Sequence, residues 1–345
     1  MTHYPETGFA ILGAGMIAEY HAQAIAANHE NGARLVAIGY YDPKRFIEIE
    51  RRFGVPCQTE QELLTNPQVD VICICTPSGQ HAAQTIAAAQ ARKHVLVEKP
   101  MATRLEDADA MIAACHQNQV TLGVVFPSRT KPVFQRIHAA IQSGELGELT
   151  LGLVNLPYYR SQDYYDQAAW RGTWALDGGG VLMNQGIHQV DLLGWFMGNP
   201  VSVQAHALTL QREIEVEDTL SASLRFANGA LAAINATVTA APGFPPRIEI
   251  YGTRGGVQTE GDTVMRWWSE DAPPKEDSVA APPSAAGAGA DPRGISTAGH
   301  IAIVSDFIKA LHEKRPPLVD GPEGRHSLAI VISIYQAAGK IAGAA

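Results

Sequence analysis

Residues 9–28 read FAILGAGMIAEYHAQAIAAN, and this stretch decides how the chain begins to fold. An apolar run up to Gly13 predicts a buried strand, and apolar side chains recur at helical spacing from Met16 onward. The junction is a G-x-G-x-x-A pattern, which predicts dinucleotide binding when it follows a strand and opens a helix. The first glycine permits a tight turn, the second lets a pyrophosphate approach the backbone, and Ala18 allows close helix-to-strand packing. We therefore expect a pyrophosphate site at the helix start, formed by Gly13, Gly15, Met16 and Ile17.

Short apolar strands alternate with amphipathic helices through the first third of the chain, which is typical of a parallel sheet wrapped by helices. The expected strands are 9–13, 35–40, 69–75, 94–98 and 121–126. The expected helices are 16–28, 46–53, 81–91 and 105–117. The sequence thus predicts an α/β fold that begins with a doubly wound Rossmann domain over residues 1–126.

The pattern changes after Arg129, where one helix over 133–143 leads into longer alternating strands at 149–156, 201–210, 219–226 and 229–239. Asn228-Gly229 is a strong hairpin signal, so residues 127–345 are expected to form a substrate-binding and oligomerisation domain. This α+β domain would carry a large open, mainly antiparallel sheet and closing helices within 301–341. Residues 269–296 are rich in Ala, Pro and Gly, and they predict a long loop that acts as a lid or is a solvated insertion.

Composition excludes several classes of partner. The chain has 345 residues, 46% of them hydrophobic, and a net charge of -9 with scattered cations, which disfavours nucleic acid and anionic membranes. No apolar stretch approaches the roughly 20 residues of a membrane helix, and the start lacks a signal pattern, so we expect a cytoplasmic protein. The cysteines show no zinc spacing and are expected to be buried, reduced thiols, namely Cys57, Cys73, Cys75 and Cys115.

The cofactor's ribose position is irregular. Dinucleotide folds usually place an acidic residue at the end of the second strand, where this sequence has Tyr40. Either Asp42 reaches back to the ribose hydroxyls, or Tyr40 packs on the adenosine while Lys44 or Arg45 meets a 2′-phosphate. The cofactor is therefore NAD or NADP, with NAD slightly favoured.

Four further landmarks occur in a fixed order along the chain. They are the run Cys75-Thr76-Pro77-Ser78-Gly79-Gln80-His81, the triplet Glu98-Lys99-Pro100, the triple glycine Gly178-Gly179-Gly180, and the set Asn184, His188 and Asp191. With the glycine motif, they resemble the Gfo/Idh/MocA oxidoreductase family over most of the chain. The resemblance implies a Rossmann domain followed by a domain whose open sheet often forms a homodimer or homotetramer interface.

The resemblance also implies roles for individual residues. Lys99 and His188 would be the catalytic pair, helped by Asn184, which stands where the family often has Asp. His188 would take the hydroxyl proton while Lys99 stabilises charge on the oxygen. Trp170 and Arg171 would close over the nicotinamide. From its helical spacing, Asp191 is expected either to orient His188 or to be a carboxylate on the helix face. The further cofactor contacts expected are Thr76, Pro77, His81, Glu98 and Lys99, and the substrate contacts are Lys99, Arg129, Tyr158, Asn184 and His188.

The family's chemistry is hydride transfer between nicotinamide and a secondary carbinol or carbonyl carbon. The expected substrate is a small polyol: a sugar, a cyclitol or a nucleotide-linked sugar. Two alternatives stay open at this point, a glycoside hydrolase that uses NAD for transient oxidation and a catalytically silent cofactor-binding regulator. No metal is expected, because no thiolate or second histidine stands at ligand spacing near His188.

Overall fold

The computed structural model describes residues 4–270, 289 and 296–341, and it divides into two compact units. The first comprises residues up to Pro127 together with Ser296–Arg325. The second comprises the described residues from Ser128 to Gly289 together with those from His326 onward. The predicted boundary near residue 126 therefore coincides with the first change of unit.

The first unit is built on a parallel sheet with strand order β3-β2-β1-β4-β5-β6. The order runs outward from β1 in both directions, which is the doubly wound arrangement predicted. Strands β1 and β4 carry unbroken apolar runs that are fully buried, as suits strands covered on both faces. The strands are β1 (Thr7–Leu12), β2 (Ala33–Gly39), β3 (Cys57–Gln58), β4 (Val71–Ile74), β5 (His94–Val97) and β6 (Leu122–Val124).

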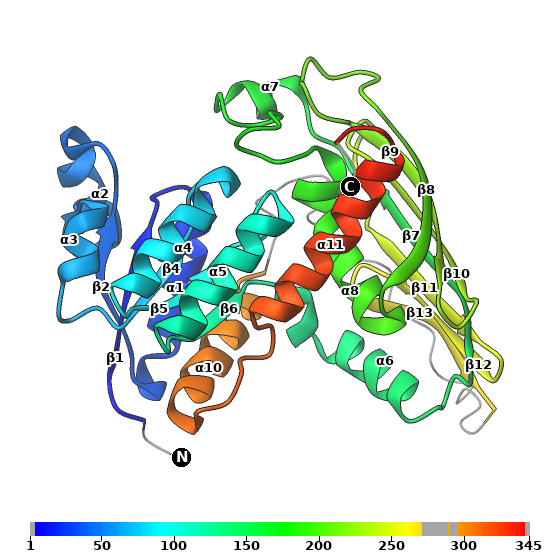
Figure 1. Ribbon diagram of the computed structural model, residues 1–345, viewed down its shortest axis with the longest axis horizontal. Coiled ribbons are helices and arrows are strands. Elements are labelled where there is room, and N and C mark those ends of the chain that lie inside the picture. The colour runs from blue at the N-terminus through cyan, green and yellow to red at the C-terminus, as the bar shows by residue number, and fades with distance from the viewer. Residues whose placement is uncertain (1–3, 271–288, 290–295, 342–345) are drawn as a thin grey trace. The chain divides into compact units, whose positions relative to one another are not determined.

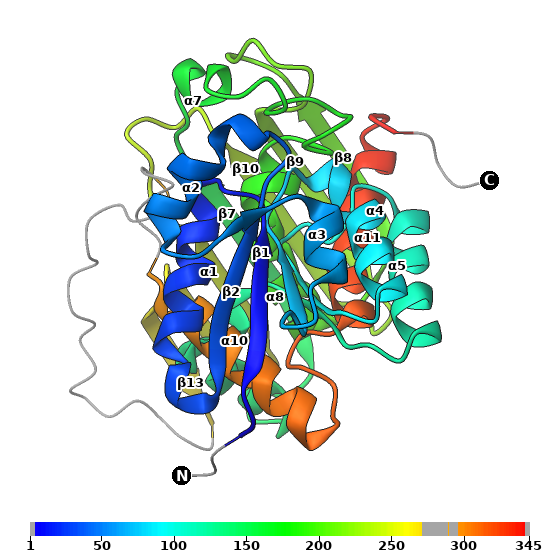
Figure 2. The same ribbon diagram turned by 90° about the vertical axis from the view of Figure 1, so that its left-hand side faces the viewer.

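Helices cover both faces of this sheet, with α1 and α10 on one flank and α4 and α5 on the other (Figure 2). The prediction assigned the closing helix near residue 301 to the second domain, and the structure corrects this. Helix α10 packs against α1, and its Phe307 lies in the core of the first unit. The helices are α1 (Met16–Ala27), α2 (Phe46–Phe53), α3 (Glu60–Thr65), α4 (His81–Gln90), α5 (Leu105–Gln117) and α10 (Ala298–Glu313).

The second unit contains a seven-stranded sheet of order β13-β12-β11-β7-β10-β9-β8. All its pairs are antiparallel except β7 with β10, and Asn228-Gly229 forms the predicted β9–β10 turn. Figure 1 shows α6, α8 and α11 on one side of this sheet. Its strands are β7 (Leu149–Pro157), β8 (Pro200–Leu208), β9 (Thr219–Phe226), β10 (Leu231–Thr237), β11 (Arg247–Gly252), β12 (Gly255–Glu260) and β13 (Thr263–Ser269). Its helices are α6 (Pro132–Gln142), α7 (Gln162–Asp166), η5 (Val181–Gly186), α8 (Ile187–Met197) and α11 (Gly321–Ala337), which begins in the first unit.

Other sequence predictions have mixed outcomes. All four cysteines are buried and free, as predicted. Within the described part of the chain, no helix is long and apolar enough to cross a bilayer. The expected lid or insertion at 269–296 falls almost wholly outside the described residues, and strands β11–β13 were not predicted at all.

Candidate active site

The carboxyl ends of β1, β4 and β5 bring three predicted segments to one edge of the first sheet. These strands are parallel neighbours, so the glycine loop, Thr76-Pro77 and Lys99 follow strand ends that lie side by side. Open α/β sheets bind ligands at this edge. The glycine loop, Thr76-Pro77 and Lys99 all belong to the first unit.

The two glycines of the loop have different surroundings. Gly13 has φ +108°, and a Cβ there would lie 2.6 Å from the carbonyl oxygen of Cys75, so the turn itself requires glycine. A Cβ on Gly15 would meet nothing within 4 Å. Gly15 caps helix α1, Met16 and Ile17 begin the helix, and Ala18 is fully buried. Open space beside the free amides of a helix start fits a dinucleotide pyrophosphate.

At the predicted ribose position, the side chains already contact one another. Tyr40 lies under the Arg45 guanidinium and accepts its hydrogen bond at 2.9 Å, while Arg45 also pairs with Glu48. Asp42 accepts from the amide of Lys44 and caps the short helical turn that follows β2. This arrangement gives Asp42 a structural role and makes Tyr40 with Arg45 a stacked surface beside the cofactor edge.

Lys99 follows β5, and its backbone amide donates a hydrogen bond to the side chain of Glu98. The Lys99-Pro100 peptide bond is cis. Glu98 is 7% exposed, and it accepts from the Lys99 amide, from His21 on α1 at 2.9 Å and from His300 on α10 at 3.5 Å. Burial alone would raise the pKa of Glu98, but these imidazoles outweigh it and hold the pKa well below its usual range.

His81 connects the two loops on either side of Lys99. Its ring nitrogens lie 2.9 Å from the carbonyl oxygens of Thr76 and Pro100, and the side chain is buried. Burial lowers the pKa of His81 although both carbonyls favour the charged ring. Neither His81 nor Glu98 lies on the surface, so both support the cofactor edge from behind, whereas Thr76, Pro77 and Lys99 are partly exposed.

In the second unit, η5 and α8 carry Asn184 and His188 one helical turn apart, and both side chains are half-buried. The side-chain amide of Asn184 donates to the carboxylate of Asp177 at 2.6 Å. Asp177 is 2% exposed and also accepts from the amide of Gly172. A carboxylate therefore lies beside Asn184, although the position itself has lost the acid that is frequent in the family.

Arg129 and Asp191 form a buried ion pair in the same unit. Their side chains are 2% and 0% exposed, the closest N–O distance is 2.8 Å, and the Ser327 hydroxyl also donates to Asp191. Arg129 is thus a structural residue, in place of the substrate contact predicted from sequence, because its charge is neutralised in the core. Asp191 pairs with Arg129 in the core, and its expected role in orienting His188 stays a prediction.

Trp170, Arg171 and Tyr158 lie among clustered aromatic rings and guanidinium groups. Arg171 stacks on Tyr164 at 4.1 Å and on Trp170 at 5.1 Å. Tyr158 is buried, and the Arg160 guanidinium lies 5.6 Å from its ring centre. Tyr158 is therefore part of the packed interior, whereas Arg171 stays partly exposed.

Comparison with known proteins decides the family. The family model described as "Oxidoreductase family, NAD-binding Rossmann fold" matches residues 7–126, and the model for the GFO/IDH/MocA C-terminal domain matches residues 134–258. The chain belongs to the Gfo/Idh/MocA oxidoreductase family. It is 30% identical to inositol 2-dehydrogenase of Rhizobium meliloti, in an alignment that covers 73% of this chain and 75% of the relative.

Solved structures of the family agree over nearly the whole chain. The WlbA dehydrogenase from Bordetella pertussis, in complex with NADH and UDP-GlcNAcA, has a TM-score of 0.88 and 35% identity, covering 98% of this chain and 97% of that one. Levoglucosan dehydrogenase with NADH and levoglucosan has a TM-score of 0.84 and 25% identity over 97% of this chain and 98% of that one. The protein is thus a family oxidoreductase that binds NAD and acts on CH–OH groups of sugars or related polyols.

Within this family framework, four polar residues of the site regions escaped the sequence analysis. His21 and His300 hold Glu98, Asp177 holds Asn184, and Glu217 binds the start of η5. His21 offered a signal, since it lies one turn past the glycine motif on the buried face of α1. Glu217 and His300 gave none, because only the tertiary fold brings them to their partners, and Asp177 lies in no motif although it is only seven residues before Asn184.

Proposed function

We propose that this enzyme oxidises a secondary carbinol of a nucleotide-linked sugar acid, of the class represented by UDP-GlcNAcA, with NAD as the hydride acceptor. The observation that carries the proposal is the likeness to the WlbA dehydrogenase, which extends over 98% of the chain at 35% identity. The structures of levoglucosan dehydrogenase with a bound sugar are similar at 25% and 24% identity. The larger likeness favours the nucleotide-linked substrate.

Cations in the second unit support an anionic substrate. Arg160 and Arg171 both lie over the ring of Tyr164, at 5.7 Å and 4.1 Å, and Arg212 donates to the carbonyl oxygen of Arg160. Neither Arg171 nor Arg212 pairs with a carboxylate in the described part of the chain. Arg171 and Arg212 are thus two cations without a carboxylate partner in the described part of the chain, and such cations favour a phosphate or carboxylate ligand.

The proposed chemistry divides among three residues. NAD, when bound, accepts the hydride from the carbinol carbon. His188 takes the hydroxyl proton, so that the C–O bond becomes a carbonyl as the hydride leaves. The ammonium group of Lys99 stabilises the negative charge that develops on that oxygen. Asn184, held by Asp177, fixes the substrate hydroxyl through its remaining hydrogen-bonding capacity.

The test is a substrate comparison read at the nicotinamide absorbance. UDP-GlcNAcA, UDP-GlcNAc, levoglucosan and myo-inositol are each offered with NAD and with NADP. We expect the highest kcat/KM for UDP-GlcNAcA with NAD, and a KM for it that rises at least tenfold in Arg171→Met. The control is Arg266→Met, an exposed arginine on β13. Higher kcat/KM for inositol or levoglucosan, with no reaction of UDP-GlcNAcA, would reject the proposed substrate class.

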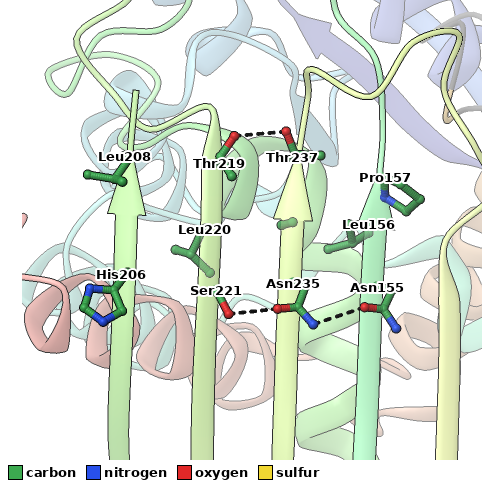
Figure 3. A pocket seen from close by; sticks show the side chains of 11 residues that line it. Asn155, Leu156, Pro157, His206, Leu208, Thr219, Leu220, Ser221, Asn235 and Thr237 are labelled. Carbon is green, nitrogen blue, oxygen red and sulfur yellow. Dashed lines mark hydrogen bonds between the residues drawn. The ribbon is translucent and has the colours of Figure 1, made fainter. Parts of the chain in front are cut away.

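We also propose that the open face of the second sheet pairs with another copy of the chain. Figure 3 shows a ladder on this face in which Ser221 donates to Asn235 and Asn235 donates to Asn155. It lies in a hollow of about 370 Å³. Leu231, 53% exposed, is on the same face, since it pairs with Leu151 four residues before Asn155. Exposed apolar side chains around satisfied polar ones mark an association surface.

Light scattering after size exclusion tests this pairing. A dimer or tetramer is expected, and Leu231→Lys should weaken it without unfolding the protein. A wild-type monomer at micromolar concentration would reject it. A cytoplasmic location stays a prediction.

A further inference from the structure

The carboxylate of Glu217 lies at the start of the helix that carries Asn184 and His188. It is fully buried, and it accepts from the backbone amides of Gly180 and Leu182, both at 2.9 Å. The carbonyl oxygen of Glu217 accepts from the amide of Val181 at 3.0 Å. Amides at a helix start have no partner within the helix. One residue from a distant segment therefore binds three of them in succession.

Tyr335 on α11 completes this cap. Its hydroxyl donates to Glu217 at 2.8 Å and accepts from the amides of Gly180 and Met183 at 3.2 Å each. These contacts also explain the glycines. A Cβ on Gly180 would lie 1.7 Å from the carbonyl oxygen of Glu217, and one on Gly179 would lie 2.3 Å from the Tyr335 hydroxyl. Gly179 and Gly180 are needed because the cap approaches the backbone so closely.

We propose that Glu217, together with Tyr335, is a positioning residue that fixes the first turns of η5 and thereby sets the places of Asn184 and His188. The inference rests on the catalytic roles proposed for those two residues. Asn184 follows the capped amide of Met183 directly, and its own amide donates to the carbonyl oxygen of Gly180. A shift of the capped turn therefore moves Asn184 first and His188 one turn later.

The donors around Glu217 suit only its ionised form. Two amides and a phenol can all donate to a carboxylate, whereas a carboxylic acid would turn a hydroxyl toward one of these donors. Burial raises the pKa of Glu217 to about 7, and the amides of Leu182 and Gly180 and the Tyr335 hydroxyl limit the rise. The other titratable groups near it are Tyr165 and, through that ring, Asp177. The cap is therefore complete above neutral pH and weakens below it.

Hydrogen exchange measured by mass spectrometry on peptides covering 178–184 tests the cap without reference to any substrate. In Glu217→Gln one amide of the pair Gly180 and Leu182 must face a side-chain NH₂, so exchange should rise at least tenfold. Tyr335→Phe keeps the ring and should give a smaller rise.

The matched control is Asp218→Asn. Asp218 is an equally buried neighbour that accepts from the amides of residues 210–212, so its loss should raise exchange there and leave 178–184 protected.

Kinetics then separates positioning from plain stability. In folded Glu217→Gln, kcat should fall at least tenfold while KM for NAD stays within twofold. The loss of protection of 178–184 below pH 7 expected in the wild type, corrected for the intrinsic exchange rate, should be absent from the variant. Unchanged exchange, or unchanged kcat, would overturn the inference. If exchange rises as expected but His188→Asn is fully active, the cap exists and the proposed role of His188 fails instead.

Discussion

At the scale of single residues, Gly13 and Gly15 stand two positions apart, but glycine is required at each for a different reason. Gly13 adopts a left-handed φ and contacts the backbone after β4, so it is required by the fold. Gly15 faces open space in an ordinary extended conformation, so it is required only by what approaches it. The sequence motif marks both glycines alike, and only the structure separates the two requirements.

This difference predicts opposite effects of the same substitution. Gly15→Ala should leave the melting temperature unchanged and weaken NAD binding on the order of tenfold, which is about 1.4 kcal/mol. Gly13→Ala should destabilise the protein by about 1–3 kcal/mol, because its backbone strain cannot relax. Thermal unfolding and NAD titration by fluorescence measure the two effects. Normal NAD affinity in Gly15→Ala would place the pyrophosphate elsewhere.

His188 gives a second prediction at this scale. His188→Asn should lower kcat roughly 10²–10⁴-fold, the usual contribution of a general base. NAD affinity should not change, because the glycine loop, which is the proposed pyrophosphate site, belongs to the first unit. Steady-state kinetics and NAD titration check this, with Lys99→Ala as the companion variant. A variant that oxidises substrate at the normal rate would assign the proton transfer to another group.

At the scale of elements, one buried carboxylate connects α1, β5 and α10. Glu98 follows β5 and accepts from a histidine on each of the two helices, so its carboxylate contacts side chains from both helices. The same residue accepts from the Lys99 amide. Elements that position the cofactor edge are therefore joined by a polar contact in an otherwise apolar core.

The sign of the resulting pH dependence follows from the pKa. The pKa of Glu98 is depressed in the folded protein, so its stabilising contribution is present above the unfolded value of about 4.3 and is lost as pH falls through the folded value. Glu98→Gln should lower the free energy of unfolding at pH 7, and its difference from wild type should shrink below about pH 4.3. Urea unfolding at several pH values measures this. Glu48→Gln, in an exposed pair with Arg45, is the control and should change little.

The sequence predicted elements where local pattern suffices. The strands of the first unit are continuous apolar runs, and their helices show clear periodicity, so their approximate positions could be predicted. Strand β11 alternates polar and apolar residues, a strand signal that the sequence analysis missed, whereas the two glycines at the start of β12 weaken its pattern. Of the candidate site, the loop residues were found because they form motifs. Partners such as Glu217 and His300 could not be found, because sequence spacing does not encode long-range contacts.

At the scale of the whole molecule, the first unit is not a continuous piece of chain. Its core includes Phe307, which is 1% exposed and approaches Gly123 of β6. The amide of Val124 in the same strand donates to the carbonyl oxygen of Val319. Local patterns could not reveal this, since α10 is as amphipathic as any helix that closes a domain.

Phe307 therefore offers a test of the division into units. Phe307→Ala should cost about 3–5 kcal/mol and weaken NAD binding, whereas Phe226→Ala in the core of the second unit should spare NAD affinity. Calorimetry with and without NAD distinguishes the two variants. Equal loss of NAD affinity in both would show that the units do not respond separately.

The discontinuity also bears on how the protein is made. When the ribosome has added Pro127, helix α10 of the same unit has not yet been synthesised. At 5–20 residues per second, translation delays that helix on the order of ten seconds. During this interval the apolar flank of α1 has no cover. We expect the nascent NAD-binding unit to depend on chaperones until the last tenth of the chain emerges, and the cofactor to join a nearly finished polypeptide.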